Sequence, residues 1–104
     1  MIHIRISMKD QKISELEISG HAGYREHGED LVCAAVSGIA FGLCNAVDIL
    51  LKGEPQVLDN LIRIRIGEPD EKTEMVMRTG MIQLQTIAES CQNYVKIEIT
   101  EVSI

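Results

Sequence analysis

Residues 31–51 read LVCAAVSGIAFGLCNAVDILL, and this stretch decides the fold. Its apolar residues cover nearly every side of a helical wheel, and Gly53 and Pro55 follow directly as stop signals. A helix that is apolar all round is buried on all sides. We therefore expect this helix to pack between a sheet and something else.

Four strands are expected around this helix, because apolar and polar residues alternate in residues 1–7, 61–66 and 94–102. Residues 12–19 form the fourth stretch, although Ile13 is out of phase with the rest of it. A short polar turn separates residues 1–7 from residues 12–19. They predict a β-hairpin, and the phase slip indicates a β-bulge.

A second helix is expected to begin at residues 69–70. Its apolar residues recur at spacings of four and three, and polar residues line the other side. The apolar side holds Met77, Met81, Leu84, Ala88 and Cys91; the partly exposed side holds Glu74, Arg78, Gln85 and Glu89. The element order is ββαβαβ, which predicts an α/β sandwich of the α+β type with a mixed four-stranded sheet, two helices and two or three layers. One domain spans residues 1–104.

Composition limits the classes of function. The formal net charge of −6 argues against a general nucleic-acid binder, which needs an excess of Lys and Arg. We find no signal peptide and no apolar run of membrane-spanning length, so we expect no membrane association. Three cysteines, an odd number, favour a reducing compartment, and we expect the protein to be cytoplasmic.

Residues 20–37, GHAGYREHGEDLVCAAVS, carry the chemistry. A loop containing Gly20, Gly23 and Gly28 presents His21, and Cys33 follows where the loop becomes a helix. A thiol at a helix start with an imidazole nearby is the minimal equipment for nucleophilic catalysis. We therefore predict a cysteine nucleophile in this segment.

The roles of the neighbours follow if Asp30 is the N-cap of the helix. The positive end of the helix dipole then stabilises a Cys33 thiolate, and His21 acts as general acid and base. The free N–H groups of Cys33 and Ala34 are candidate donors to an oxyanion, and Ser37 lies on the same helix face as Cys33. Asp30 either caps the helix or orients His21, as in a Cys–His–Asp arrangement.

The other cysteines and histidines have less specific settings. Cys44 and Cys91 are predicted to be structural, since a free cysteine packs as a small hydrophobe. An intramolecular disulfide between Cys33 and Cys44 is excluded unless the helix unfolds, because the two residues are eleven positions and about 16 Å apart along the helix. His27 is a rival base in an exposed charge cluster. The spacing of His21, His27 and Cys33 matches no structural zinc motif, and we expect no metal.

A basic sheet face is the main alternative to catalysis. Arg63 and Arg65 point to the same side of their predicted strand, as do His3 and Arg5 of the first. This face suits a non-catalytic, ribosome-associated binding module that contacts RNA. A solvated sheet surface explains the same residues.

The segment resembles a bacterial family, the ribosomal-processing cysteine proteases called Prp. The family signature is a Gly-His-Ala-Gly run, a short loop, and Gly-x-Asp followed by an aliphatic residue and Val-Cys-Ala-Ala-Val-Ser. Here GHAG stands at 20–23, Gly28 and Asp30 match, and VCAAVS stands at 32–37. The resemblance covers essentially the whole chain, although residues 53–104 match only in general pattern.

The resemblance implies a protease that removes a short N-terminal extension, ending in hydrophobic and aromatic residues, from a precursor of a large-subunit ribosomal protein. The family's catalytic cysteine and histidine map onto Cys33 and His21, with Asp30 and Ser37 near the site. It further implies a homodimer, no cofactor, no direct contact with nucleic acid, and a loop over residues 22–29 that closes on the substrate. Ala22, Gly23, Tyr24 and Gly28 belong to that loop.

Overall fold

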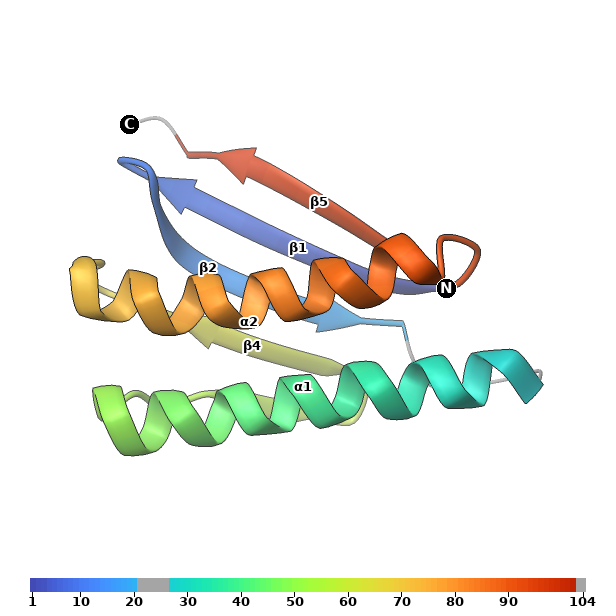
Figure 1. The fold of residues 1–104 in the computed structure, drawn as a ribbon. Coiled ribbons are helices and arrows are strands. Elements are labelled where there is room, and N and C mark those ends of the chain that lie inside the picture. The colour runs from blue at the N-terminus through green and yellow to red at the C-terminus, as the bar shows by residue number, and fades with distance from the viewer. Residues whose placement is uncertain (21–26, 103–104) are drawn as a thin grey trace.

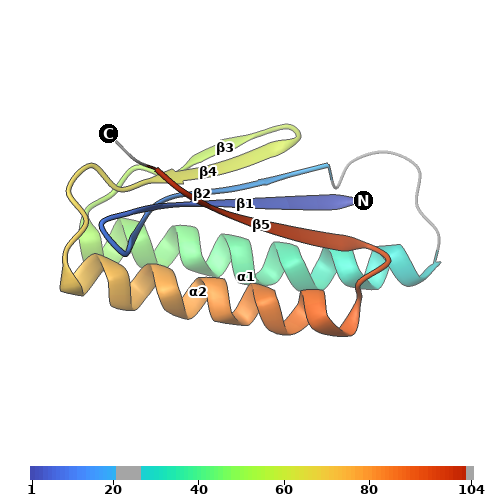
Figure 2. The same cartoon turned by 90° about the horizontal axis from the view of Figure 1, so that it is seen from above.

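The protein is a two-layer structure in which both helices cover one face of a single sheet, as a computed structural model describes it (Figures 1 and 2). The structure describes residues 1–20 and 27–102, with the backbone alone for residues 27–30. Its elements are β1 (Ile2–Lys9), β2 (Lys12–Ser19), α1 (His27–Leu51), β3 (Gln56–Leu58), β4 (Leu61–Arg65), α2 (Glu71–Ser90) and β5 (Val95–Glu101). The predicted α+β class with two helices is confirmed. The prediction allowed two or three layers, and the structure has two.

The sheet has five strands rather than the four predicted, in the order β3-β4-β2-β1-β5. β1 and β5 pair in parallel and the other neighbours are antiparallel, so the predicted mixed sheet is confirmed. The missed strand, β3, has only three residues, all of them exposed. A strand this short at the sheet edge carries no alternation that a sequence pattern can detect.

The β1–β2 hairpin contains the predicted bulge. Ser7 pairs with Glu15, but Met8 pairs with Ile13, so Ser14 is the extra residue in β2. The Ser14 hydroxyl donates to the Ser7 carbonyl at 3.1 Å. This extra residue brings Ile13 back onto the buried face, where it is fully covered.

α1 begins at His27, three residues before the predicted N-cap, Asp30. The expectation of a loop that lasts to residue 29 is therefore wrong, and Gly28 and Asp30 both belong to the helix. Acidic residues favour the first turn of a helix as much as its N-cap. The charge pattern of this segment thus fits either starting point.

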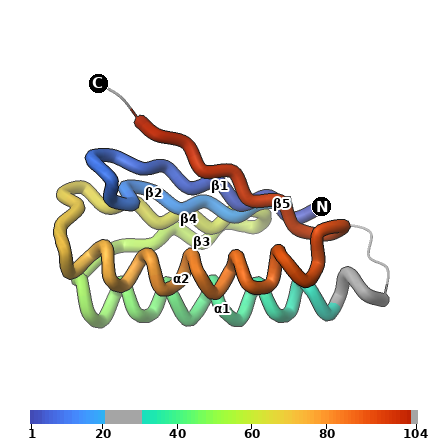
Figure 3. Tube along the Cα trace, turned by 45° about the horizontal axis from the view of Figure 1, so that its top comes forward, coloured from blue at the N-terminus to red at the C-terminus, as the bar shows by residue number. Residues whose placement is uncertain are grey.

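Only one side of α1 is covered within the single chain. Val36, Ala40 and Val47 are buried against the sheet, whereas Leu31 and Ile49 on the other side are 67% and 69% exposed. The sequence had predicted cover on both sides. No second layer lies over the outer side of the helices in the described residues (Figure 3).

The segment Leu31–Leu51 is long and apolar enough to cross a membrane by length and composition. Our expectation that no run reaches that length is therefore wrong. A single such helix is weak evidence for a membrane span, because the core helix of a soluble protein passes the same test. The sheet that covers the inner side of α1 supports the core-helix explanation.

α2 starts as predicted, with Asp70 as the N-cap and a reciprocal capping box to Thr73. Met77, Met81 and Leu84 are buried, and Ala88 and Cys91 are partly buried against the core. The other side of α2 was predicted to be partly exposed. On that side Glu89 is exposed, and Glu74, Arg78 and Gln85 are half-buried.

Glu74 explains why this polar side of α2 is half-buried. Its carboxylate accepts the backbone N–H of Ile13 at 2.8 Å and also pairs with Arg78. The polar side therefore ties α2 to the bulged hairpin. Met75 and Ile82 are the large apolar residues of α2 that are exposed instead.

Candidate active site

Cys33 is the seventh residue of α1 and only 5% exposed. It lies in the cluster of buried residues that joins the helix to the sheet. Six residues separate it from the helix start, about 9 Å along the axis. The thiol is therefore in the second helical turn rather than at the cap.

The predicted oxyanion donors change with this helix start. Only the first four backbone N–H groups of an α-helix are without a partner inside the helix. With α1 beginning at His27, Cys33 and Ala34 lie beyond these four positions. The prediction that their N–H groups are free for an oxyanion is wrong, and so is the N-cap role of Asp30.

The predicted base and most of the loop lie outside the described residues. This applies to His21, Ala22, Gly23 and Tyr24. Gly28 is described as a helical residue, which removes it from the predicted loop. The partnership of His21 with Cys33 stays a prediction.

Gly20, the last described residue before His21, has a conformation that requires glycine. Its φ is +85°, and an added Cβ would lie 2.5 Å from the carbonyl oxygen of Met1. Gly20 follows the end of β2 and lies beside the start of β1, since Ser19 pairs with His3. The close approach of the Met1 carbonyl and the positive φ both exclude a side chain at this position.

The immediate neighbours of Cys33 are small. Ala34 is exposed and Ala35 half-buried, so the two residues that follow Cys33 place no bulky side chain beside it. Ser37 is half-buried, one turn further along the same side of α1 as Cys33. These placements agree with the predicted proximity of Ser37 and Cys33.

The other two cysteines lie far from the start of α1. Cys44 is 7% exposed in the middle of α1, and desolvation by burial raises the pKa of its thiol. This shift disfavours the thiolate that nucleophilic attack requires. Cys91 is the C-cap of α2 and half-buried. Cys33 is thus the cysteine nearest the start of α1.

The arginines of the sheet face are paired with carboxylates. Arg63 Nε lies 3.0 Å from Glu17 Oε2, and Arg65 Nε lies 2.5 Å from Glu15 Oε1. Arg5 is 3.8 Å from the other oxygen of Glu17. These cross-strand pairs neutralise the basic face and weaken the alternative of an RNA-binding module.

The fold and the segment around Cys33 have known counterparts. The family model described as "Cysteine protease Prp" matches residues 1–96. The chain belongs to this family. The ribosomal processing cysteine protease Prp of Staphylococcus aureus (strain Mu50) is 30% identical over 103 residues, which cover 93% of this chain and 97% of that protein.

Solved structures of S. aureus Prp share the fold. One contains a substrate peptide and has a TM-score of 0.82, at 27% identity, over 96% of this chain and 100% of that one. Another contains a covalently linked product peptide and has a TM-score of 0.81 at the same identity and coverage. The predicted enzyme class is confirmed: this member of the Prp family is a cysteine protease, a hydrolase.

Proposed function

We propose that this Prp family member removes the N-terminal extension of a large-subunit ribosomal protein precursor by endoproteolysis. The observation that carries the proposal is the covalently linked product peptide of the S. aureus relative. A peptide held by a covalent bond is the expected result of nucleophilic catalysis. The relatives' names, which specify ribosomal processing, support the class of substrate.

In the proposed mechanism Cys33 is the nucleophile. Its Sγ attacks the scissile carbonyl carbon as a thiolate, and the C–N bond breaks when His21 protonates the departing amine. A water molecule, deprotonated by His21, then attacks the resulting thioester and releases Cys33 as the thiolate. The match of residues 32–37 to the VCAAVS part of the family signature supports this assignment over Cys44 and Cys91.

Substrate binding has to open access to the thiol, since Cys33 is only 5% exposed. We propose that Ala22, Gly23 and Tyr24, which follow His21, close over the peptide once it has reached the thiol. Small residues next to the thiol, Ala34 above all, leave room for the peptide backbone. The site is then complete only when a bound peptide has ordered this loop. Proteins that cannot order the loop are not cleaved, which limits the specificity of the protease to its substrate.

Two polar residues complete the proposed site. Ser37, on the Cys33 side of α1, contributes a hydroxyl near the reacting carbonyl. Asp30 lies three residues before Cys33, nearly one helical turn away, and orients His21. Because Asp30 is not an N-cap, the orienting function is the one of its two predicted roles that we propose.

We further propose that the protease acts as a homodimer in the cytoplasm. The ribosomal precursor is its macromolecular partner, and catalysis requires no cofactor, metal or nucleic acid. The ion pairs of Arg63 and Arg65 support the absence of RNA from this list.

The decisive experiment is mass spectrometry of a purified ribosomal precursor incubated with wild-type protein, Cys33→Ala or Cys91→Ala. We expect one cut at the extension boundary with the wild type and with Cys91→Ala, the matched cysteine control, and none with Cys33→Ala. His21→Ala should slow cleavage by about 10²–10⁴-fold. Cleavage by Cys33→Ala at the wild-type rate contradicts the mechanism, and no cleavage by any variant contradicts the substrate.

A further inference from the structure

β5 is an edge strand, and the backbone groups on its outer side pair with no strand in the described residues. The sheet order ends at β5, and its residues pair with β1 alone. The Val102 N–H donates to the Met8 carbonyl at 2.7 Å, so the even-numbered residues of this strand point their backbone groups toward β1. Successive residues of a strand point these groups to opposite sides, so residues 97, 99 and 101 point theirs outward. An extended chain can bind to these groups as a sixth strand.

The apolar side of β5 becomes more exposed along the strand. Val95 is buried, Ile97 is partly buried and Ile99 is 52% exposed, although all three point to the side of the sheet that carries α2. Figure 1 shows that β5 and α2 diverge from the end where a turn joins them. Between them lies a cavity of about 280 Å³, which is lined by Gln85, Ala88, Glu89, Gln92 and Ile97.

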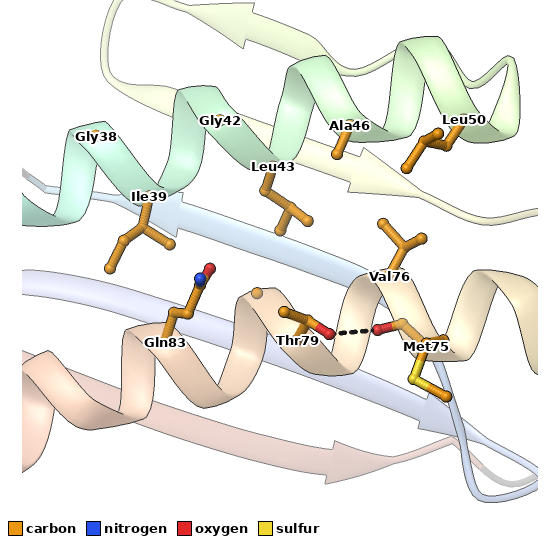
Figure 4. A pocket seen from close by; sticks show the side chains of 11 residues that line it. Gly38, Ile39, Gly42, Leu43, Ala46, Leu50, Met75, Val76, Thr79 and Gln83 are labelled. Atoms are coloured by element: carbon orange, nitrogen blue, oxygen red, sulfur yellow. Dashed lines mark hydrogen bonds between the residues drawn. The ribbon is translucent and has the colours of Figure 1, made fainter.

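α2 contributes another exposed isoleucine to the same region. Ile82 is 53% exposed, and it shares one flank of the helix with Gln85 and Glu89, which line the cavity. Thr79 and Gln83 line the larger groove between α1 and α2 instead (Figure 4). The flank that carries Ile82 is therefore turned away from α1 and toward β5.

Carboxylates surround these isoleucines and select the chemistry of an occupant. Glu89 and Glu101 make no ion pair among the described residues, whereas Lys96 Nζ lies 3.5 Å from Glu98 Oε1. Five residues make up this surface, which we call the β5 edge: Ile82, Glu89, Ile97, Ile99 and Glu101. Lys and Arg suit the β5 edge, because their aliphatic stems pack on isoleucine while their charged ends reach the carboxylates. A second copy of this chain, with a formal net charge of −6, brings the same carboxylates and is disfavoured.

We propose that the β5 edge binds a basic, extended segment of the mature part of the ribosomal protein precursor as an added strand. This inference rests on the protease function proposed above and extends it to substrate recognition away from the bond that is cut. A protein that binds ribosomal RNA neutralises phosphates with Lys and Arg, so the mature part of the precursor supplies basic segments. Backbone hydrogen bonds give an added strand its affinity, and the side chains beside it give the selectivity.

The β5 edge is within reach of a substrate held at the candidate active site. β1 separates β5 from β2, the strand that leads to His21, so an added strand beyond β5 lies three strand spacings, about 14 Å, from β2. Ser19 at the end of β2 is level with Lys96, because both pair with His3. Ile99 is three residues further, about 10 Å along the strand. The resulting separation of about 17 Å is spanned by about six extended residues.

The test measures KM and kcat on two substrates. One is the full precursor, and the other is a synthetic peptide with four residues on each side of the cut, which is too short to reach the β5 edge. Ile99→Pro removes an N–H that β1 does not use, as an edge strand tolerates, and Ile99→Lys places a cation beside a basic strand. Val57→Lys is the matched control, because Val57 lies in the opposite edge strand and is also 52% exposed. Circular dichroism shows that each variant is folded.

We expect Ile99→Pro and Ile99→Lys to raise KM for the precursor about tenfold with kcat unchanged, because the lost contact binds ground state and transition state equally. Both variants should cut the short peptide as the wild type does, and Val57→Lys should match the wild type on both substrates. An unchanged KM for the precursor in the Ile99 variants, or an equal rise on both substrates, overturns the proposal. An equal effect of Val57→Lys overturns it too. If Ile99→Pro changes the mass of the protein in sedimentation equilibrium, a second copy occupies the β5 edge and the proposal is again overturned.

Calorimetric titration with the mature ribosomal protein, which lacks the extension, separates this inference from the protease proposal. We expect the wild type and Val57→Lys to bind the mature protein equally, and Ile99→Pro to bind it about tenfold more weakly. A wild type that shows this binding but does not cut the precursor contradicts the protease proposal alone. A wild type that cuts the precursor but binds the mature protein no better than Ile99→Pro overturns the β5 edge alone.

Discussion

Gly80 of α2 lies against the side chain of Leu43 of α1, and its replacement by alanine tests the packing of the core. An added Cβ at Gly80 would lie 2.5 Å from Leu43 Cδ2, 2.9 Å from Cδ1 and 3.1 Å from Cγ. Leu43 is itself 6% exposed and belongs to the core. The whole Leu43 side chain, and not only its end, must therefore move.

Two opposing effects set the magnitude. Alanine in place of glycine in a helix interior stabilises the folded state by about 1 kcal/mol. Overpacking of a close-packed core costs about 1–3 kcal/mol. The overpacking is larger because Cγ is involved, so we expect Gly80→Ala to lower the free energy of unfolding by about 1 kcal/mol and the melting temperature by about 5 °C.

Urea unfolding followed by circular dichroism measures this change. Gly38→Ala is the matched control, because it is also in a helix interior but its Cβ meets nothing within 4 Å. We expect the control to gain about 1 kcal/mol when compared with the wild type under conditions of equal association state. If Gly80→Ala is as stable as Gly38→Ala, Leu43 adjusts freely and the reasoning about close packing is refuted.

Three further predictions concern other parts of the chain. Gly20→Ala should cost about 1–3 kcal/mol in urea unfolding, because its φ of +85° is strained for alanine and its Cβ meets the Met1 carbonyl; an unchanged midpoint contradicts this. Glu74→Ala should lower the free energy of unfolding by about 2 kcal/mol, because it leaves the backbone N–H of Ile13 without its acceptor. Glu74→Gln keeps an acceptor and should lower it by less. Equal losses for the two variants would show that the hydrogen bond is unimportant. Burial raises the pKa of Cys44 above its ordinary value of 9.0, so its contribution to stability is complete below pH 9 and is lost as the pH rises through the folded-state pKa. Unfolding of the wild type and Cys44→Ala as a function of pH should therefore diverge above pH 9, and parallel profiles contradict the assignment.

Much of the candidate site could be predicted from sequence, because its residues stand close together in one motif. The choice of Cys33 as nucleophile follows from the motif in residues 20–37 and stays a prediction, whereas its place within a helix is confirmed. The exact start of α1 does not follow, because Gly28 and Asp30 favour a loop and a cap only locally. The backbone around Cys33 depends on this start, so the predicted N–H donors were wrong.

Residue periodicity was enough to predict the elements that have a clear period. Alternation in the strands, the phase slip at Ile13 and the spacing of Met77, Met81 and Leu84 each report which side of an element is apolar. Pattern alone also indicated the bulge and the start of α2. These features depend on neighbours within a few positions along the chain.

Only the tertiary structure decided what each side meets. It paired β3 with β4, turned Glu74 toward the backbone of Ile13, and left the outer side of α1 without cover in the single chain. Periodicity shows that a side needs a partner but not which element supplies it. That choice depends on contacts between residues far apart in sequence, 61 positions in the case of Glu74 and Ile13, and no local pattern records them.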